Sequence, residues 1–193
     1  QLNLLGLLSY TNAKLQDDVI IGAVNYVPVA IPATPTSVAI PASTAAPSIP
    51  AGETYFCNPL PTTLPTAPGV YSYNVCARTA GKRVVETPEW QIGGRAELNL
   101  DPILFGIQFK HVGERFATDV NDVLSAGYTT VDLDARAELP FVGKNTYLQV
   151  NVTNLFDKRY FGNLSTTINA FGFNSSQPRF TPVAPRSILA TLN

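Results

Sequence analysis

The feature that most constrains this chain is an alternation of apolar and polar side chains over residues 129–160. In the first half, the odd positions from Thr129 to Leu139 are apolar or neutral, and the even positions are polar. After a turn at residues 142–145 the alternation returns, with Leu and Val on one side and amides or Thr on the other. A period of two is typical of β-strands. The stretch therefore predicts a hairpin with one apolar face and one polar face.

The apolar face of such a hairpin can meet either a second sheet or lipid. In a soluble sandwich it would face a core, whereas in a membrane barrel it would face the bilayer while the polar face lined a watery lumen. The 193 residues carry a net charge of -1 and are 45% hydrophobic, which suits neither a nucleic-acid-binding protein nor a disordered chain. No run of about 18 apolar residues is present, which excludes a membrane-spanning helix.

Four further segments alternate in the same way, so the chain is predicted to contain six strands. The four segments are residues 2–15, 89–100, 103–115 and 184–193. The connections after the first, third and fifth strands are long, at residues 16–82, 117–127 and 162–182. The other two connections are short turns, at residues 101–102 and 142–145.

This regular change in connection length favours a transmembrane barrel, in which long loops gather on the outer side and tight turns on the periplasmic side. The aromatic residues at the strand ends agree with two interfacial girdles: Tyr10, Trp90, Phe116, Tyr128, Phe156 and Tyr160 near the long loops, and Phe141 and Tyr147 near a short turn. Six strands cannot close a barrel, because the smallest have about eight. We therefore expect an all-β, antiparallel section of a larger barrel wall, with residues 1–193 as one segment of it. A soluble β-sandwich remains the alternative fold.

The connection at residues 16–82 is rich in proline, and we predict a long extracellular loop that forms no sheet. Cys57 and Cys76 both lie within it, 19 positions apart. Two cysteines in one segment suit a local disulfide in an oxidising compartment better than a metal site, which needs three or four ligands. We predict the disulfide and no metal site. The chain begins at Gln1 and contains no Met, so we expect it to be a piece of a longer precursor.

Several short sequence motifs in the chain resemble those at the C-terminal end of TonB-dependent outer-membrane receptors. Residues 152–160, VTNLFDKRY, are similar to the family's V-x-N-L-F-D-K-x-Y, and residues 184–187 are similar to its G-x-P-R. Residues 9–13 resemble its S-Y-T-x-A, residues 87–90 its T-P-x-W, and residues 112–116 and 128–132 also match. The matches cover most of the chain outside the long connections.

The resemblance implies that these are the last six strands of a barrel of about 22 strands, in the outer membrane of a Gram-negative bacterium. It implies contact with outer-membrane lipid and lipopolysaccharide. It also implies uptake of a scarce nutrient driven through TonB, whose contact sites and plug domain would lie N-terminal to this segment. Ferric siderophore is the expected ligand, because it is the commonest ligand class in the family. A passive porin or a structural wall protein is the alternative function.

No catalytic group is expected, and no cofactor. His111 is the only histidine, it shares its strand face with Ile107 and Phe109, and no serine motif accompanies it, so an interfacial histidine is the simpler interpretation. Acidic pairs at residues 17–18 and at 119 and 122 lack the glycine and ligand spacing of a calcium loop, which favours solvated charge. A cross-strand charge ladder in the lumen is the simpler interpretation of the ionisable residues on the polar strand faces. These residues are Arg95, Glu97, Lys110, Asp132, Asp134, Arg136 and Glu138.

Aromatic and basic residues in the long connections are the candidate ligand-binding residues. Stacking and charge could together hold an anionic iron chelate. The candidates are Tyr71, Tyr73, Arg78, Phe171, Phe173 and Arg179. The competing interpretation, that these aromatics only pack the loops, stays open at this point.

Overall fold

The computed structural model describes residues 1–49, 52–143, 145–165 and 178–193. Within these ranges every regular element is a β-strand and every pairing of strands is antiparallel, which confirms the predicted fold class. The part of the chain that is described contains no helix long and apolar enough to cross a membrane.

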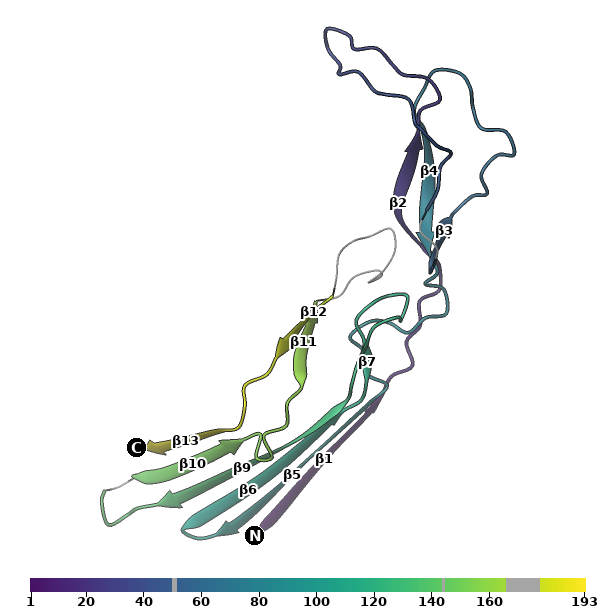
Figure 1. Cartoon of the computed structure of the whole chain (residues 1–193). Helices are drawn as coiled ribbons and strands as arrows, with labels where there is room; N and C mark the ends of the chain where they lie inside the picture. The colour runs from purple at the N-terminus through teal and green to yellow at the C-terminus, as the bar shows by residue number, and fades with distance from the viewer. Residues whose placement is uncertain (50–51, 144, 166–177) are drawn as a thin grey trace.

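Six strands form one sheet, here called the wall (Figure 1). In spatial order they are β1 (Leu2–Tyr10), β5 (Trp90–Leu100), β6 (Ile103–Val112), β9 (Tyr128–Glu138), β10 (Tyr147–Thr153) and β13 (Ser187–Leu192). Spatial order and chain order agree, so each wall strand pairs with the wall strands before and after it. β1 and β13 form the two edges, and the sheet is therefore open rather than closed into a barrel.

One face of the wall is apolar across all six strands. A single row of cross-strand partners, one from each strand, consists of Leu4, Ala96, Ile107, Leu133, Val152 and Ile188. The large side chains of this face are open to the surroundings in the isolated chain: Leu4 is 74% exposed and Ile107 47%. A continuous apolar surface of this kind marks contact with lipid or with another protein surface.

The opposite face carries the charged residues predicted to line a lumen. Glu97, Gly106, Asp134 and Asn151 form one row on β5, β6, β9 and β10. Arg95, Gln108 and Asp132 form the next row. The side chains of Arg95, Glu97 and Asp134 are joined by ion pairs, so the predicted charge ladder exists at this point of the sheet.

The long connections leave the wall at one end, and the two short turns and both chain termini lie at the other (Figure 1). Tyr10 and Trp90 are cross-strand partners at the long-connection end, with ring centroids 4.5 Å apart. Phe141, in the short turn, is 83% exposed. Tyr128 differs from the girdle prediction, because it is buried on the polar side of the wall, where its ring stacks on that of Tyr160.

The prediction that residues 16–82 form no sheet is wrong. This segment, here called the arm, contains β2 (Val19–Tyr26), β3 (Thr54–Phe56) and β4 (Tyr71–Ala77), which pair in the order β2-β4-β3 and project beyond the wall (Figure 1). The three strands occupy proline-free stretches between the proline-rich ones. Proline density therefore excluded pairing only where the prolines themselves stand.

The other long connections, together with the residues next to them, also form short strand pairs that the alternation did not predict. β7 (Arg115–Phe116) pairs with β8 (Leu124–Ser125), and β11 (Phe161–Ser165) pairs with β12 (Arg179–Pro182). The wall strands end earlier than predicted, β1 at Tyr10 and β10 at Thr153. After β10, Asn154 has a positive φ of 55°, and its side chain bonds to the backbone N and O of Lys158. Asparagine favours such a turn, which is why the strand stops inside the V-x-N-L-F-D-K motif.

Candidate functional site

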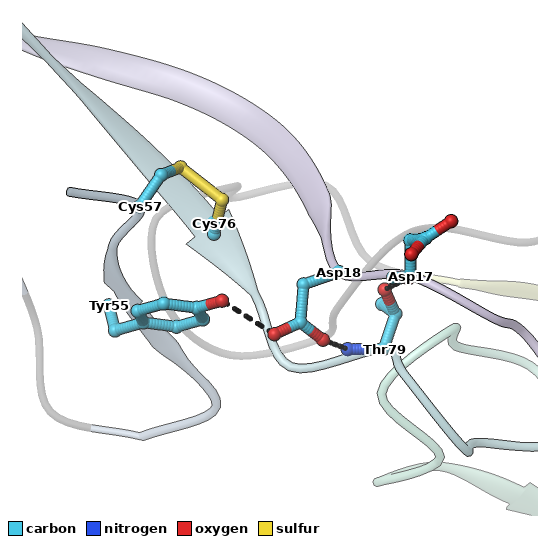
Figure 2. The surroundings of a disulfide bond; sticks show 6 residues. All are labelled: Asp17, Asp18, Tyr55, Cys57, Cys76 and Thr79. Carbon is cyan, nitrogen blue, oxygen red and sulfur yellow. Dashed lines mark hydrogen bonds between the residues drawn. A yellow bond between two sulfur atoms is a disulfide. The ribbon is translucent and has the colours of Figure 1, made fainter.

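The arm is closed at its base by the predicted disulfide between Cys57 and Cys76, whose Cα atoms are 5.1 Å apart (Figure 2). Cys57 follows β3 directly and Cys76 lies in β4, where it is the cross-strand partner of Tyr55. Because β4 is the central strand of the arm sheet, the disulfide ties its edge strand β3 to the centre. The described residues contain no cluster of three or more metal-ligating side chains.

Asp18 holds together the two chain ends of the arm (Figure 2). Its carboxylate accepts hydrogen bonds from the Tyr55 hydroxyl at 2.5 Å and from the backbone N–H groups of Thr79 and Ala80 at 2.8 Å. The hydrogen bond from Tyr55 is the largest of the effects that lower the pKa of Asp18, and the same bond raises the pKa of Tyr55. The prediction that Asp18 is a solvated charge is therefore wrong. Its carboxylate has a structural role, and we call the set of hydrogen bonds from Tyr55, Thr79 and Ala80 the Asp18 clasp.

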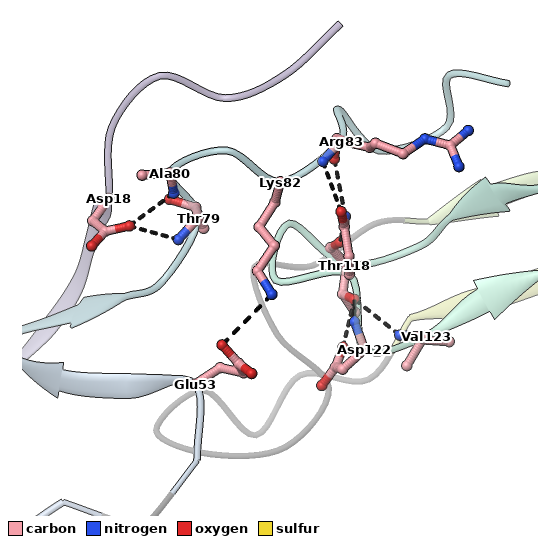
Figure 3. Close-up of polar contacts among 10 residues, drawn as sticks. Asp18, Glu53, Thr79, Ala80, Lys82, Arg83, Thr118, Asp122 and Val123 are labelled. Atoms are coloured by element: carbon pink, nitrogen blue, oxygen red, sulfur yellow. Dashed lines mark hydrogen bonds and ion pairs between the residues drawn. The ribbon is translucent and has the colours of Figure 1, made fainter. Parts of the chain in front are cut away.

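A second set of contacts fixes Arg83, the residue directly after the arm, to the connection between β7 and β8 (Figure 3). The Asn121 side chain accepts a hydrogen bond from Arg83 N at 2.7 Å and donates one to Arg83 O at 3.0 Å. The Arg83 guanidinium lies 3.5 Å from Glu89 and 3.6 Å from Glu114. The backbone and side chain of Arg83 therefore join the end of the arm to the residues directly before β5 and β7 and to the β7–β8 connection.

Neither acidic pair singled out in the sequence forms a ligand cage. Thr118 donates a hydrogen bond to the Asp122 carboxylate at 2.5 Å, and its hydroxyl accepts bonds from Asp122 N and Val123 N (Figure 3). Asp119 is half-buried, and burial raises its pKa. Asp122 thus orders the β7–β8 connection locally through Thr118.

The candidate ligand-binding residues fall into separate places. Tyr71 and Tyr73 lie on β4 with Tyr26 and Val24 as cross-strand partners, and Arg78 follows β4 with its guanidinium 4.6 Å from the centre of the Tyr55 ring. Arg179 begins β12, which belongs to a different sheet from the arm strands. Phe171 and Phe173 lie outside the described residues. The structure therefore groups the three arm residues near one strand and places Arg179 apart from them.

The remaining predicted polar residues sit on the charged face of the wall. Arg136 stacks over the Tyr147 ring at 3.8 Å, and the Asp132 carboxylate accepts a hydrogen bond from Asn154 N at 2.7 Å. On the apolar face, His111 Nδ1 and Thr129 Oγ1 are 2.8 Å apart near the long-connection end of the wall. His111 is thus hydrogen-bonded to the neighbouring strand β9.

No family model and no curated protein matches the chain. Solved structures with similar folds include the siderophore receptor PiuA from Acinetobacter baumannii, which is 24% identical over 61% of this chain and 16% of that receptor, with a TM-score of 0.48. They also include the ferric-catecholate import receptor Fiu from E. coli K12, at 23% identity, 65% and 17% coverage and a TM-score of 0.43.

A third match is the ferric yersiniabactin uptake receptor FyuA from Yersinia pestis, which is 18% identical and covers 63% of this chain and 18% of that one, with a TM-score of 0.46. The chain thus spans between 16% and 18% of the length of these three receptors. The likeness concerns the fold.

Proposed function

We propose that this chain is a section of the wall of a TonB-dependent outer-membrane transporter, the family that its sequence motifs resemble, and that the complete protein imports a ferric siderophore. The observation that carries the proposal is the two-faced wall, whose strand connections sort by length. An apolar row spans all six strands on one face, and paired charges occupy the other. Lipid on the first side and a watery lumen on the second satisfy both faces.

The position of the arm supports a role in solute recognition. It joins the wall at the long-connection end, which is the outer end in barrels of this kind (Figure 1). The disulfide, the Asp18 clasp and the Arg83 contacts give it a fixed base. A loop that is anchored in this way presents its surface at little entropic cost on binding. Tyr71, Tyr73 and Arg78 are the arm residues that we propose for contact with an anionic chelate.

Growth of the source bacterium on single ferric siderophores as the iron source tests the proposed function. We expect deletion of the complete gene to abolish growth on at least one siderophore and deletion of tonB to have the same effect. Growth that depends on the gene but not on tonB would instead indicate a passive porin. Growth that is unchanged by the gene deletion on every iron source would contradict import.

Deleting residues 27–68 from the complete protein tests the arm separately. The deletion joins Tyr26 to Gly69-Val70-Tyr71, and Tyr26 and Tyr71 are already cross-strand partners, so a two-residue hairpin loop with glycine at its first position would result. Cys76→Ser is added because the deletion removes Cys57, and Cys76→Ser with Cys57→Ser in the full-length arm is the control. We expect normal insertion with weaker siderophore capture, whereas unchanged capture of every siderophore would exclude residues 27–68 from recognition and leave Tyr71, Tyr73 and Arg78 as the arm residues to be tested by substitution.

A further inference from the structure

Arg115, at the start of β7, is a buried cation without a carboxylate partner. Its side chain is 8% exposed and lies 5.9 Å from the centre of the Tyr128 ring. Its terminal nitrogens donate to the backbone carbonyls of Phe161 at 2.8 Å and Gly162 at 3.5 Å. Within the described ranges no ion pair involves Arg115, and its Nε has no hydrogen-bond partner. A buried charge left in this state is costly unless an anion balances it.

Ser125 adds a second unsatisfied donor beside the first. It is 3% exposed, and its hydroxyl has no partner among the residues that the structure describes. Ser125 is also the direct cross-strand partner of Arg115 in the β7–β8 pair. Directly opposed residues project from the same face, with Cβ atoms about 5 Å apart. Two buried polar groups without a hydrogen-bond partner, Arg115 Nε and the Ser125 hydroxyl, therefore belong to directly opposed residues.

Ser125 also lines an open cleft of about 350 Å³, which lies between β8 with the two residues after it and the turn after β10. The cleft lining includes Ser125, Gly127, Lys158, Arg159, Tyr160 and Phe161. It contains two cations and no carboxylate, and neither Lys158 nor Arg159 forms an ion pair with any described residue. The volume falls within the range of small-molecule sites.

We propose that this cleft, the Ser125 cleft, binds the carboxylate or phosphate group of a small anionic solute. A hydroxyl, an ammonium and a guanidinium are the donors that oxyanions use in proteins, and charge assistance strengthens such bonds. Arg115 does not line the cleft but donates a hydrogen bond to the carbonyl of Phe161, which does, and so adds positive charge next to it. Tyr160 and Phe161 offer apolar surface to the body of the solute. The proposal rests on the proposed function in one respect. If the complete protein is a receptor, the cleft lies at its outer end and would select for a negatively charged solute there.

Calorimetric titration of the complete protein in detergent tests binding without reference to transport, with inorganic phosphate and citrate as probes. We expect both probes to bind, and the double variant Lys158→Gln/Arg159→Gln to weaken binding at least about 10-fold. Ser125→Ala is expected to weaken it by roughly 5-fold through loss of one donor. Lys14→Gln, which removes an exposed cation on the connector between β1 and the arm, is the matched control and should bind as the wild type does.

The same titration in nanodiscs separates two sources of the oxyanion. If the cleft receives a soluble anion, the probes bind equally in detergent and in nanodiscs that contain phosphorylated lipid A. If it receives a lipid phosphate, phosphorylated lipid A excludes the probes and dephosphorylated lipid A does not. Either result supports an oxyanion site. Absence of binding in every medium, or equal binding by the wild type and by Lys158→Gln/Arg159→Gln, would overturn it, even where siderophore import is intact.

Discussion

Arg95 and Asp134 form a bidentate ion pair, although another strand of the sheet lies between their own two strands. Arg95 Nη1 and Nη2 lie 2.9 Å and 3.2 Å from the two Asp134 carboxylate oxygens, and Arg95 is on β5 while Asp134 is on β9. The intervening position on β6 is Gly106, the cross-strand partner of both Glu97 and Asp134. A Cβ at Gly106 would lie 2.7 Å from Arg95 Nη2 and closer still to an Asp134 carboxylate oxygen. The missing side chain is what lets the two charges meet.

Replacing Gly106 with alanine should therefore break this ion pair. We expect the complete protein to lose about 1–2 kcal/mol of unfolding free energy in a urea titration, because the added methyl displaces both charged groups. Gly93→Ala is the matched control, since a Cβ there meets its nearest atoms at 3.7 and 3.8 Å, which is ordinary contact. In an Asp134→Ala background the Gly106→Ala cost should shrink, and an undiminished cost would assign the effect to the backbone instead.

A charged residue introduced on the apolar face should lower the folding stability of the protein in a membrane. Leu133 occupies the fourth position of the row that crosses the wall, so Leu133→Arg should cost roughly 2–4 kcal/mol in a folding assay in lipid vesicles. Asn151→Arg provides the contrast, because Asn151 lies on the charged face as the cross-strand partner of Asp134. We expect that change to stay within about 1 kcal/mol of the wild type. Equal costs for the two variants would show that the faces are assigned wrongly.

The disulfide should stabilise the arm and leave the wall unchanged. In the chain-entropy account, closing a loop of 19 residues contributes about 3 kcal/mol. Cys57→Ser/Cys76→Ser should therefore speed amide hydrogen exchange in β3 and β4, while exchange in β5, β6 and β9 stays as in the wild type. Hydrogen exchange followed by mass spectrometry of the complete protein resolves the two regions, and equal protection of the arm in both proteins would refute the assignment.

The Asp18 clasp should make the base of the arm sensitive to acid. Because the pKa of Asp18 is lower in the folded arm than in an unfolded one, its stabilising effect is fully present above the unfolded value of about 3.9. This stabilisation is lost as the pH falls through the lower, folded pKa. Limited proteolysis of the arm should thus accelerate below about pH 4 in the wild type.

Asp18→Asn is the test of this pH dependence. It should raise arm cleavage at neutral pH, because the amide lacks the charge that strengthens the bonds from Tyr55 and from Thr79 N. It should also flatten the response to acid. Asp17→Asn is the neighbouring control, since only the backbone carbonyl of Asp17 takes part, as the acceptor for the Thr79 hydroxyl. A wild-type acid response in Asp18→Asn would place the titrating group elsewhere.

The amino-acid sequence by itself determined the wall. Alternation is a local property, because consecutive side chains of a strand point to opposite faces, and so the six strands, their two faces and the order of long and short connections could all be predicted. The disulfide was predictable for a similar reason, since the two cysteines share one segment. The arm sheet was missed, although two proline-free stretches carry a strand signal, β-branched residues at 19–26 and tyrosines with one valine at 71–77.

Only the tertiary structure decided which distant groups meet. Asp18 contacts residues 61 and 62 positions away, and Arg115 reaches carbonyls 46 and 47 positions away. No periodicity encodes such contacts, because they depend on how the connections leave the wall and turn. The same holds for Arg95 and Asp134: the strand pattern predicts that they share a face, and the register that sets Gly106 between Glu97 and Asp134 is what brings their charges together.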